Sequence, residues 1–303
     1  MKSTRKAYGE FLVELGKIDT NVIVFDADLA KATCTDMFKK EFPNRHFDIG
    51  ISEQDMVCTA CGAALSGKTV FASTFAMFMA GRAYEQIRNT AAYSHININL
   101  CATHSGLAVG EDGPSHQCIE DISLMRVIPG MTVLSPADDI STKKILGECL
   151  KLDGPKYIRL GRSDTMDIYS ENDIFEIGGS KTFGAGTNGT IFATGNTVSI
   201  ALEAKEELKK NNINVRVVDL YSIKPVDKDN IIKSAKESEI LVSIEDHSVI
   251  GGIGSLVADV LCEYYPKKII KIGVNDTFGK SGNAKKVYEI FGITKENIIS
   301  KFI

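Results

Sequence analysis

Short apolar runs rich in β-branched residues alternate along the chain with longer segments whose apolar positions have a helical spacing. Near-continuous apolar strands separated by helices are typical of a parallel sheet that is covered on both faces. Right-handed crossovers between such strands make a doubly wound α/β domain the default arrangement. Strands are predicted in this way at residues 21–28, 46–52, 68–74, 97–104, 131–136 and 156–161, and helices at residues 54–65 and 75–93.

The pattern breaks after Arg162 and restarts further on. Residues 163–188 are rich in Asp, Ser, Asn and Gly and have weak periodicity. A chain of 303 residues is long enough for about two domains. We therefore predict two doubly wound α/β domains, residues 1–165 and residues 189–303, joined by a linker at residues 166–188. The strands of the second, smaller domain are predicted at residues 190–195, 214–222, 239–246 and 268–276.

Composition and charge narrow the kinds of partner that the chain can have. A net charge of -4 gives no general basic surface, so a nucleic acid is not expected as a partner. No apolar run approaches the roughly 20 residues that a bilayer crossing needs. The N-terminal stretch MKSTRKAYGEFLVELG predicts an amphipathic helix rather than a signal peptide. The seven cysteines follow no small-scaffold pattern, so we expect reduced thiols in a cytoplasmic protein.

Ligands of open α/β sheets bind beyond the carboxyl ends of the strands. Acids, a histidine and an arginine gather at the predicted strand ends, and this clustering indicates a functional site there. The residues expected at this edge are Asp26, Asp28, Ser52, Glu53, Ser73, Thr74, Thr103, His104 and Arg162.

The strongest candidate for chemistry is the stretch ATHSGLAVGEDGPSHQ, residues 102–117. A predicted strand runs directly into a glycine-rich loop that holds His104, Asp112 and His116. Its glycines let the backbone take positive φ values and approach a ligand closely. The alternative is a surface loop with capping residues, although loops carry function disproportionately often.

Three further residues have both a structural and a functional interpretation. Glu53 follows a predicted strand at the start of a helix, where capping and the helix dipole also favour a glutamate. Phe75 and Phe78 are predicted at positions i and i+3 of a first helical turn, so that both rings face one side. Such rings either pack in the core or stack on a flat heteroaromatic ligand.

Arg5 and Arg162 are the basic candidates. Arg5 lies near the N-terminus, and Arg162 follows the turn glycine Gly161. Each of them alone is typical of a solvated surface charge. If the fold brings both arginines to His104 and His116, however, the four side chains form a phosphate clamp.

Together these motifs resemble, over essentially the whole chain, the C-terminal half of transketolase made as a separate subunit, that is, a pyrimidine-binding domain followed by the smaller C-terminal domain. The resemblance implies a pentose phosphate pathway transferase that moves a two-carbon ketol unit from a ketose phosphate to an aldose phosphate. It also implies the cofactor thiamine diphosphate, which is the electron sink of the reaction. The segments that carry the resemblance are STRKA with Arg5, ISEQDM with Glu53, STFAMF with Phe75 and Phe78, ATHSGLAVGEDGPSHQ, YIRLGR with Arg162, and SIEDHSVIGGIGSLVADVL in the second domain.

On the cofactor side, the resemblance gives Glu53 the role of the cofactor-activating glutamate. This residue is a carboxylic acid that forms a hydrogen bond with the pyrimidine N1′ atom and drives the imino form of the ring. Phe75 and Phe78 correspond to the aromatic pair against the pyrimidine. Asp28 is a further expected cofactor contact.

On the substrate side, the resemblance implies that His104 and Asp112 contact the sugar hydroxyls near the reacting carbons. Arg5, His116 and Arg162 are expected to steer the substrate chain and its phosphate. The expected catalytic residues are Glu53, His104 and His116.

One motif of thiamine enzymes is absent. The family holds the diphosphate through a divalent ion bound by a GDG motif and a later asparagine, and the sequence contains no GDG. Hard cations at a diphosphate need such oxygen ligands. We therefore expect an N-terminal transketolase subunit to carry the diphosphate-binding domain and the Mg²⁺ or Ca²⁺, with no metal ligand on this chain. The family expectation is a heterotetramer of two pairs, self-associated across a two-fold axis.

Two departures from the family pattern leave the preferred sugar open. Full-length transketolases have a third aromatic residue after the Phe pair, where this chain has Gly81 followed by Arg82. The phosphate-binding serine of the family corresponds to about Ala32, with Thr33 adjacent.

Alternatives from two classes stay open. A 1-deoxyxylulose-5-phosphate synthase-like protein or a 2-oxo acid dehydrogenase β-subunit shares the glutamate and the two-domain layout. The loop with both histidines and Asp112 favours a sugar phosphate donor over a 2-oxo acid. A non-catalytic scaffold or regulatory relative is expected to have lost Glu53 or the histidines, and the chain keeps them.

Overall fold

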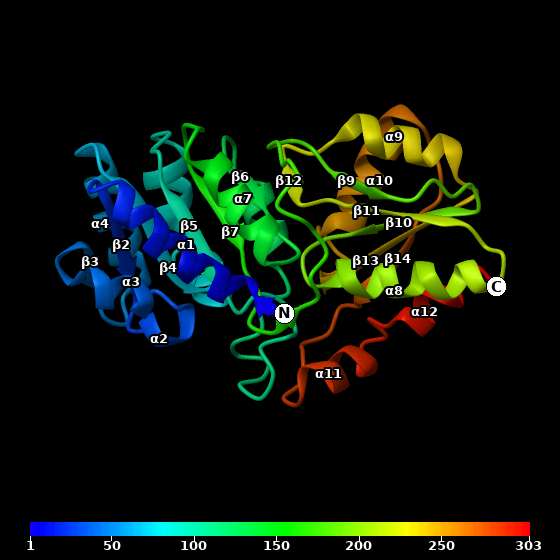
Figure 1. Cartoon of the computed structure of the whole chain (residues 1–303), viewed down its shortest axis with the longest axis horizontal. Helices are drawn as coiled ribbons and strands as arrows, with labels where there is room; N and C mark the ends of the chain where they lie inside the picture. Colours follow the sequence, from blue (N-terminus) through cyan, green and yellow to red (C-terminus); the bar gives the residue numbers. More distant parts are fainter.

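Two β-sheets, each covered by helices, lie side by side along the length of the molecule (Figure 1). The computed structural model describes all 303 residues. The first sheet has seven strands and comes mainly from the first half of the chain, and the second has five strands from the second half. These two largely parallel sheets confirm the predicted α/β fold class.

The strands of the first sheet are β2 Val22–Asp26, β3 His46–Asp48, β4 Thr69–Phe75, β5 Asn99–Thr103, β6 Thr132–Leu134, β7 Lys156–Arg159 and β12 Ser222–Lys224. Their order is β12-β6-β7-β5-β4-β2-β3, and every pairing is parallel except the one between β12 and β6. The helices of this half are α1 Thr4–Ile18, α2 Ala30–Thr33, α3 Asp36–Glu41, α4 Glu53–Leu65, α5 Tyr84–Gln86, α6 Asp121–Arg126 and α7 Asp139–Cys149, with a 3₁₀ turn η1 at Pro43–Arg45.

The strands of the second sheet are β9 Lys181–Phe183, β10 Gly189–Ala193, β11 Val215–Asp219, β13 Ile240–Ser248 and β14 Ile270–Val274. Their order is β14-β13-β10-β11-β9, and β9 is an antiparallel edge strand. The helices are α8 Thr197–Lys210, α9 Lys228–Glu237, α10 Ile253–Tyr264, α11 Ala284–Ile290 and α12 Lys295–Ile299. Figure 1 shows α8 and α12 on one face of this sheet and α9 and α10 on the other.

Two strand pairings join distant parts of the sequence. Strand β12 belongs to the second half of the chain but pairs with β6 of the first sheet. At the N-terminus, β1 Lys2–Ser3 pairs with β8 Asp164–Thr165, and the Arg5 amide donates to the carbonyl of Gly161 at 3.4 Å. The pairing therefore places Arg5 beside the end of β7, where Arg162 follows. The predicted linker contains strand β9, and the predicted domain limits stay a prediction.

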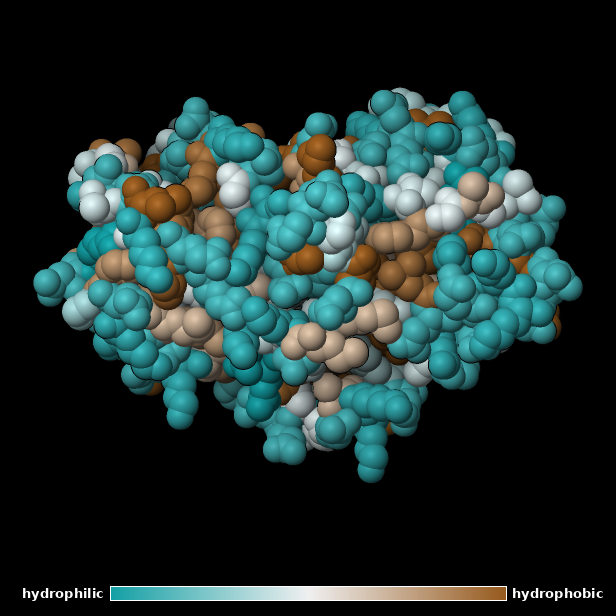
Figure 2. All heavy atoms as spheres, viewed as in Figure 1, coloured by the Kyte–Doolittle hydropathy of each residue, from teal (hydrophilic) through white to brown (hydrophobic).

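Apolar strands and the inner faces of the helices form the core. Helix α1 lies on the first sheet through the fully buried Tyr8 and Leu12, and the Tyr8 ring packs 6.2 Å from that of Phe71. Most of the surface in Figure 2 is hydrophilic, with scattered apolar groups. None of the helices combines the length and the apolar character that a bilayer crossing needs.

The segment after β4 differs from the helix predicted over residues 75–93. Phe75 is the last residue of β4, and the chain then forms two π-helical turns, η2 Met77–Arg82 and η3 Ile87–Ala92, on either side of α5. The prediction that Phe75 and Phe78 share a first helical turn is wrong, because β4 still pairs with β5 at Phe75. Turns of the π type are rare and are frequent at functional sites.

Candidate active site

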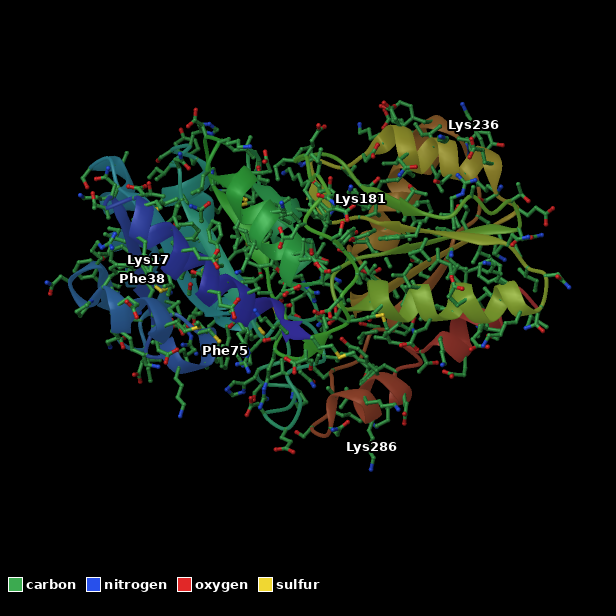
Figure 3. The ribbon with its side chains drawn as sticks, viewed as in Figure 1. Lys17, Phe38, Phe75, Lys181, Lys236 and Lys286 are labelled. Atoms are coloured by element: carbon green, nitrogen blue, oxygen red, sulfur yellow. The ribbon has the colours of Figure 1, made fainter.

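Four of the predicted aromatic side chains meet at the carboxyl edge of the first sheet. The Phe75 ring lies 5.8 Å from the Phe78 ring and 3.8 Å from the His104 ring, with interplanar angles of 15° and 27°. The His116 ring is edge-on to both phenylalanines, at 6.1 and 5.4 Å. Figure 3 shows Phe75 at the lower edge of the first sheet. These four rings, here called the aromatic platform, suit a flat heteroaromatic ligand.

Their meeting follows from the strand order. Strands β4 and β5 are parallel neighbours, so Phe75 at the end of one and His104 just after the other come together. His104 takes a left-handed conformation with φ of 57°, which is uncommon outside glycine. The backbone therefore turns sharply at the point where the strand enters the long loop.

Glu53 is the first residue of α4, and its side chain is only 1% exposed. A buried carboxylate needs a cation or hydrogen-bond donors to compensate its lost hydration. Arg82 supplies this partner, with its Nη1 atom 2.7 Å from Oε2 of Glu53. The guanidinium carbon of Arg82 also lies 4.5 Å from the centre of the Phe78 ring. Glu53 is therefore connected to the aromatic platform through Arg82.

His104 is held as a neutral ring in one tautomer. Burial, and after it the nearby Arg5, Arg162 and His116, lower the pKa of His104 to about 3. Its Nε2 atom lies 3.3 Å from Nη1 of Arg5, which has only hydrogens to donate, so Nε2 is the acceptor. Its Nδ1 atom then donates to the hydroxyl of Thr103 at 2.9 Å.

Arg5 and Arg162 both line a pocket of about 380 Å³ beside His104, together with Gly110 and Glu111 of the long loop. The Nε atom of Arg5 is buried and has no hydrogen-bond partner. Burial, joined by the charge of Arg162, lowers the pKa of Arg5. An anion bound between the two arginines would accept hydrogen bonds from their guanidinium groups and compensate the repulsion between the two like charges. The pocket thus has the donor set of an anion site.

The remaining predicted site residues are more exposed to solvent. Asp112 is exposed and forms an ion pair of 3.3 Å with Nη1 of Arg162. The His116 Nδ1 atom lies 2.8 Å from the hydroxyl of Ser115. Asp28 is exposed, and its carboxylate makes no hydrogen bond or ion pair, so the structure does not connect it to the aromatic platform.

A buried ionic group beneath the long loop was not predicted from the sequence. The Arg159 side chain, 2% exposed, forms ion pairs with Asp121 at 2.9 Å and with Asp246 of the second half at 2.7 Å. Tyr157 donates to Asp121 at 3.0 Å and Tyr288 to Asp246 at 2.9 Å. Although burial alone lowers it, the two carboxylates raise the pKa of Arg159 well above its ordinary value. A charged residue inside the apolar run KYIRLG was the available signal.

The second half of the chain also touches the long loop directly. Gly106 has φ of 71°, and a Cβ atom at this position meets Oδ2 of Asp246 at 2.1 Å. The amide of Gly282 donates to the carbonyl of Gly110 at 3.4 Å. The loop that carries His104 is therefore packed between the first sheet and the second half of the chain.

The glycines at residues 251–254, where α10 begins, allow a buried carboxylate to approach the amides of the helix. The Glu245 carboxylate accepts hydrogen bonds from the amides of Ile253 and Gly254, at 2.7 and 3.0 Å. A Cβ atom at Gly252 meets Glu245 Oε2 at 1.9 Å, so the close approach needs glycine there. An internal carboxylate thus occupies the amides that an external anion would use.

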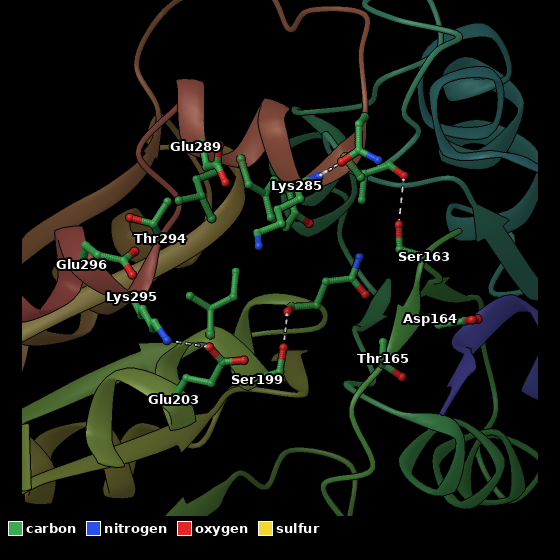
Figure 4. A pocket seen from close by; sticks show the side chains of 17 residues that line it. Ser163, Asp164, Thr165, Ser199, Glu203, Lys285, Glu289, Thr294, Lys295 and Glu296 are labelled. Carbon is green, nitrogen blue, oxygen red and sulfur yellow. Dashed lines mark hydrogen bonds and ion pairs between the residues drawn. The ribbon is translucent and has the colours of Figure 1, made fainter. Parts of the chain in front are cut away.

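A cavity of about 850 Å³ lies between the two halves of the chain (Figure 4), and no residue of the aromatic platform lines it. Ser163 and Asp164 line it on one side and also border the smaller anion pocket. Side chains of α8, α11 and α12 line the other side, where Lys295 faces Glu203 at 3.6 Å. Its charges are of both signs, and it contains no predicted catalytic residue.

Two protein-family models match the chain. The model for transketolase, pyrimidine binding domain, matches residues 1–167, and the model for transketolase, C-terminal domain, matches residues 180–298. The first match covers every strand of the first sheet except β12, and the second match covers β12 and the strands of the second sheet. The matches also place the aromatic platform in the first of the two regions.

Individual relatives match over nearly their whole length. A Methanocaldococcus jannaschii protein with the provisional name transketolase C-terminal section is 47% identical over 305 residues, 100% of this chain and 96% of that protein. The 6-deoxy-6-sulfo-D-fructose transketolase subunit SqwH of Clostridium sp. (strain MSTE9) is 36% identical over 295 residues, 97% of this chain and 92% of that protein. A solved structure of a split gene transketolase, an inactive beta4 tetramer, has a TM-score of 0.92 at 44% identity, covering 100% of this chain and 97% of that one.

Proposed function

This chain belongs to the transketolase family, and we propose that it supplies the pyrimidine side of a thiamine diphosphate site shared with a partner chain. The complex would transfer a two-carbon ketol unit from a ketose phosphate to an aldose phosphate. The observation that carries the proposal is the meeting of a buried glutamate, an aromatic platform and an arginine pocket at one sheet edge.

The residues at this edge fit the pyrimidine end of the cofactor. Glu53 is buried and offers a carboxyl group for the pyrimidine N1′ atom, and Phe75 and Phe78 offer stacked rings beside it. When bound, thiamine diphosphate would supply the nucleophilic carbon and the electron sink for breaking the ketose bond. Glu53 would hold a proton at N1′, and the platform would orient the ring and exclude water.

The substrate would lie between the aromatic platform and the arginine pocket. Arg5 and Arg162 both line the pocket and would donate hydrogen bonds from their guanidinium groups to a terminal phosphate. His104 is neutral, and its Nε2 atom would accept a hydrogen bond from a sugar hydroxyl when Arg5 turns from it to the phosphate. His116 and Asp112 lie on the exposed side, where they would contact the sugar chain.

The diphosphate and its divalent ion would take their ligands from another chain. No cluster of three or more His, Cys, Asp or Glu side chains is arranged to hold a metal ion, and the GDG motif is absent from the sequence. We propose an N-terminal transketolase subunit as the partner, in a heterotetramer with Mg²⁺ or Ca²⁺ on that subunit. The inactive tetramer formed by a similar split-gene chain supports the idea that this half alone is inactive.

The test is a two-substrate assay on the complex of this chain with a candidate partner that contains a GDG motif. Xylulose 5-phosphate is the donor and ribose 5-phosphate the acceptor, with thiamine diphosphate and Mg²⁺ present. Formation of a seven-carbon ketose phosphate supports the proposal. Turnover of a 2-oxo acid donor instead of the ketose phosphate would replace it with an oxo acid dehydrogenase or synthase type of reaction.

A further inference from the structure

Arg82 lies where the proposed function expects the pyrimidine of the cofactor. Its Nη1 atom is 2.7 Å from Oε2 of Glu53, and its guanidinium carbon is 4.5 Å from the centre of the Phe78 ring. A guanidinium group is planar and delocalised, stacks on aromatic faces and donates hydrogen bonds in its own plane. An aminopyrimidine bound between the same glutamate and the same ring would also make one hydrogen bond to the carboxyl group and one stacking contact, although Glu53 would then hold the shared proton at N1′ and be the donor.

We propose that Arg82 is an internal substitute for the pyrimidine and that it leaves Glu53 when thiamine diphosphate binds. The inference rests on the proposed function of Glu53 and the aromatic platform. It adds a residue that competes with the cofactor and so sets its affinity.

The surroundings of Glu53 explain why a substitute is present. The carboxylate is 1% exposed and has one cationic partner. Removing the only partner of a buried charge is strongly destabilising, because the charge then has neither water nor a counter-ion. Arg82 therefore stabilises the chain while the cofactor is absent. When the cofactor binds, Arg82 would leave, and the carboxylate would take up a proton from solvent that it then shares with N1′.

The weak attachment of the Arg82 side chain allows it to leave Glu53. Its side chain is 43% exposed, and it makes no hydrogen bond other than the one to Glu53. It is the last residue of the π-helical turn η2. The buried Arg159, by contrast, has ion pairs to two carboxylates and is 2% exposed. Release of Arg82 into solvent thus breaks one ion pair and one ring contact.

The competition between Arg82 and the cofactor changes the apparent dissociation constant of the cofactor. An apparent dissociation constant is the intrinsic one divided by the fraction of molecules whose site is free. If Arg82 pairs with Glu53 about nine times in ten, the cofactor binds about tenfold more weakly than it would without the arginine.

The experiment measures thiamine diphosphate binding by titration calorimetry, with Mg²⁺, on the complex of this chain with its GDG-containing partner. Arg82→Met keeps the apolar stem and removes the charge, and Arg82→Gln serves as a second variant. The control is Arg88→Met, because Arg88 is exposed and bonds only to the adjacent Asn89. We expect the dissociation constant to fall about three- to tenfold in both Arg82 variants and to be unchanged in the control.

An unchanged dissociation constant would overturn the inference, and a raised one would show that Arg82 holds the bound cofactor instead. A second measurement uses this chain alone, with urea unfolding of Arg82→Met, Glu53→Gln and the double variant. The inference predicts that Arg82→Met destabilises the chain less when Glu53 is already Gln. Equal effects in both backgrounds also overturn it. A wild-type complex that binds no cofactor refutes the proposed function, while the unfolding cycle still measures the Arg82 and Glu53 pair.

Discussion

Replacement of Arg159 by Met tests whether the two halves of the chain are held together by the buried ionic group. Arg159 is the only cation between Asp121 and Asp246, both of which are fully buried. Arg159→Met leaves two carboxylates buried with only tyrosine donors. Breaking a buried ion pair costs about 3–5 kcal/mol, because an uncompensated charge remains. We expect a loss of this size in the free energy of unfolding.

Arg126 provides a matched control. It also joins the two halves, through the carbonyl of Gly251 at 3.0 Å and Asp259 at 2.9 Å. The Asp259 side chain is 68% exposed, however, so water can replace the lost partner. Arg126→Met should therefore cost at most about 1 kcal/mol.

The assay is urea unfolding of the purified chain, followed by far-ultraviolet circular dichroism and by tyrosine fluorescence. Adding Asp121→Asn to the Arg159→Met variant should recover part of the loss, since one buried charge disappears. A loss below about 1 kcal/mol, equal to that of the Arg126 control, would refute the view that Arg159 joins the halves. No recovery in the double variant would also contradict it.

Three further predictions concern the site and the second sheet. Glu53→Ala should abolish turnover of the complex while the circular dichroism spectrum stays unchanged, because the only group left unpaired is the half-exposed Arg82; retained turnover contradicts the role of Glu53. Arg5→Met should raise the KM for a phosphorylated donor about 10- to 100-fold, the loss of one charge-assisted hydrogen bond, and leave an unphosphorylated donor unaffected; equal effects on both donors would rule out a phosphate contact. Burial raises the pKa of Asp219 to about 8. Between about pH 4 and pH 8 the folded chain therefore holds a proton that the unfolded chain has lost. The free energy of unfolding falls as the pH rises through this range, by up to about 1.4 kcal/mol per pH unit. Asp219→Asn should lack this fall in urea unfolding at pH 5 and 7.5, and an identical pH dependence in both proteins would show that Asp219 is ionised.

The alternation of apolar strands and helices predicted the fold class, because buried parallel strands are apolar on both faces. The motifs also predicted the resemblance to the C-terminal section of a split transketolase, which is confirmed. The hydrophobic pattern gave a wrong prediction at Phe75, because the small and apolar residues there suit either a strand or a helix. Only pairing with β5 decides between them.

The contacts between distant residues could not be predicted from local pattern. Strand β12 carries no signal that it leaves its own half and joins β6. Arg159 was not predicted as a structural residue, and its partners Asp121 and Asp246 are known only from the tertiary structure. Arg82 was noticed as a departure from the family, and its ion pair with Glu53 depends on the π-helical turn η2.

The most direct test of the shared site is a titration of this chain into a fixed amount of the partner subunit. Thiamine diphosphate, Mg²⁺, xylulose 5-phosphate and ribose 5-phosphate are present at saturating concentrations, and two-carbon transfer is followed. The proposal predicts no turnover with either chain alone and a rise in turnover that stops at an equimolar ratio. Turnover by this chain alone, or none at any ratio in a mixture that binds the cofactor, would contradict it.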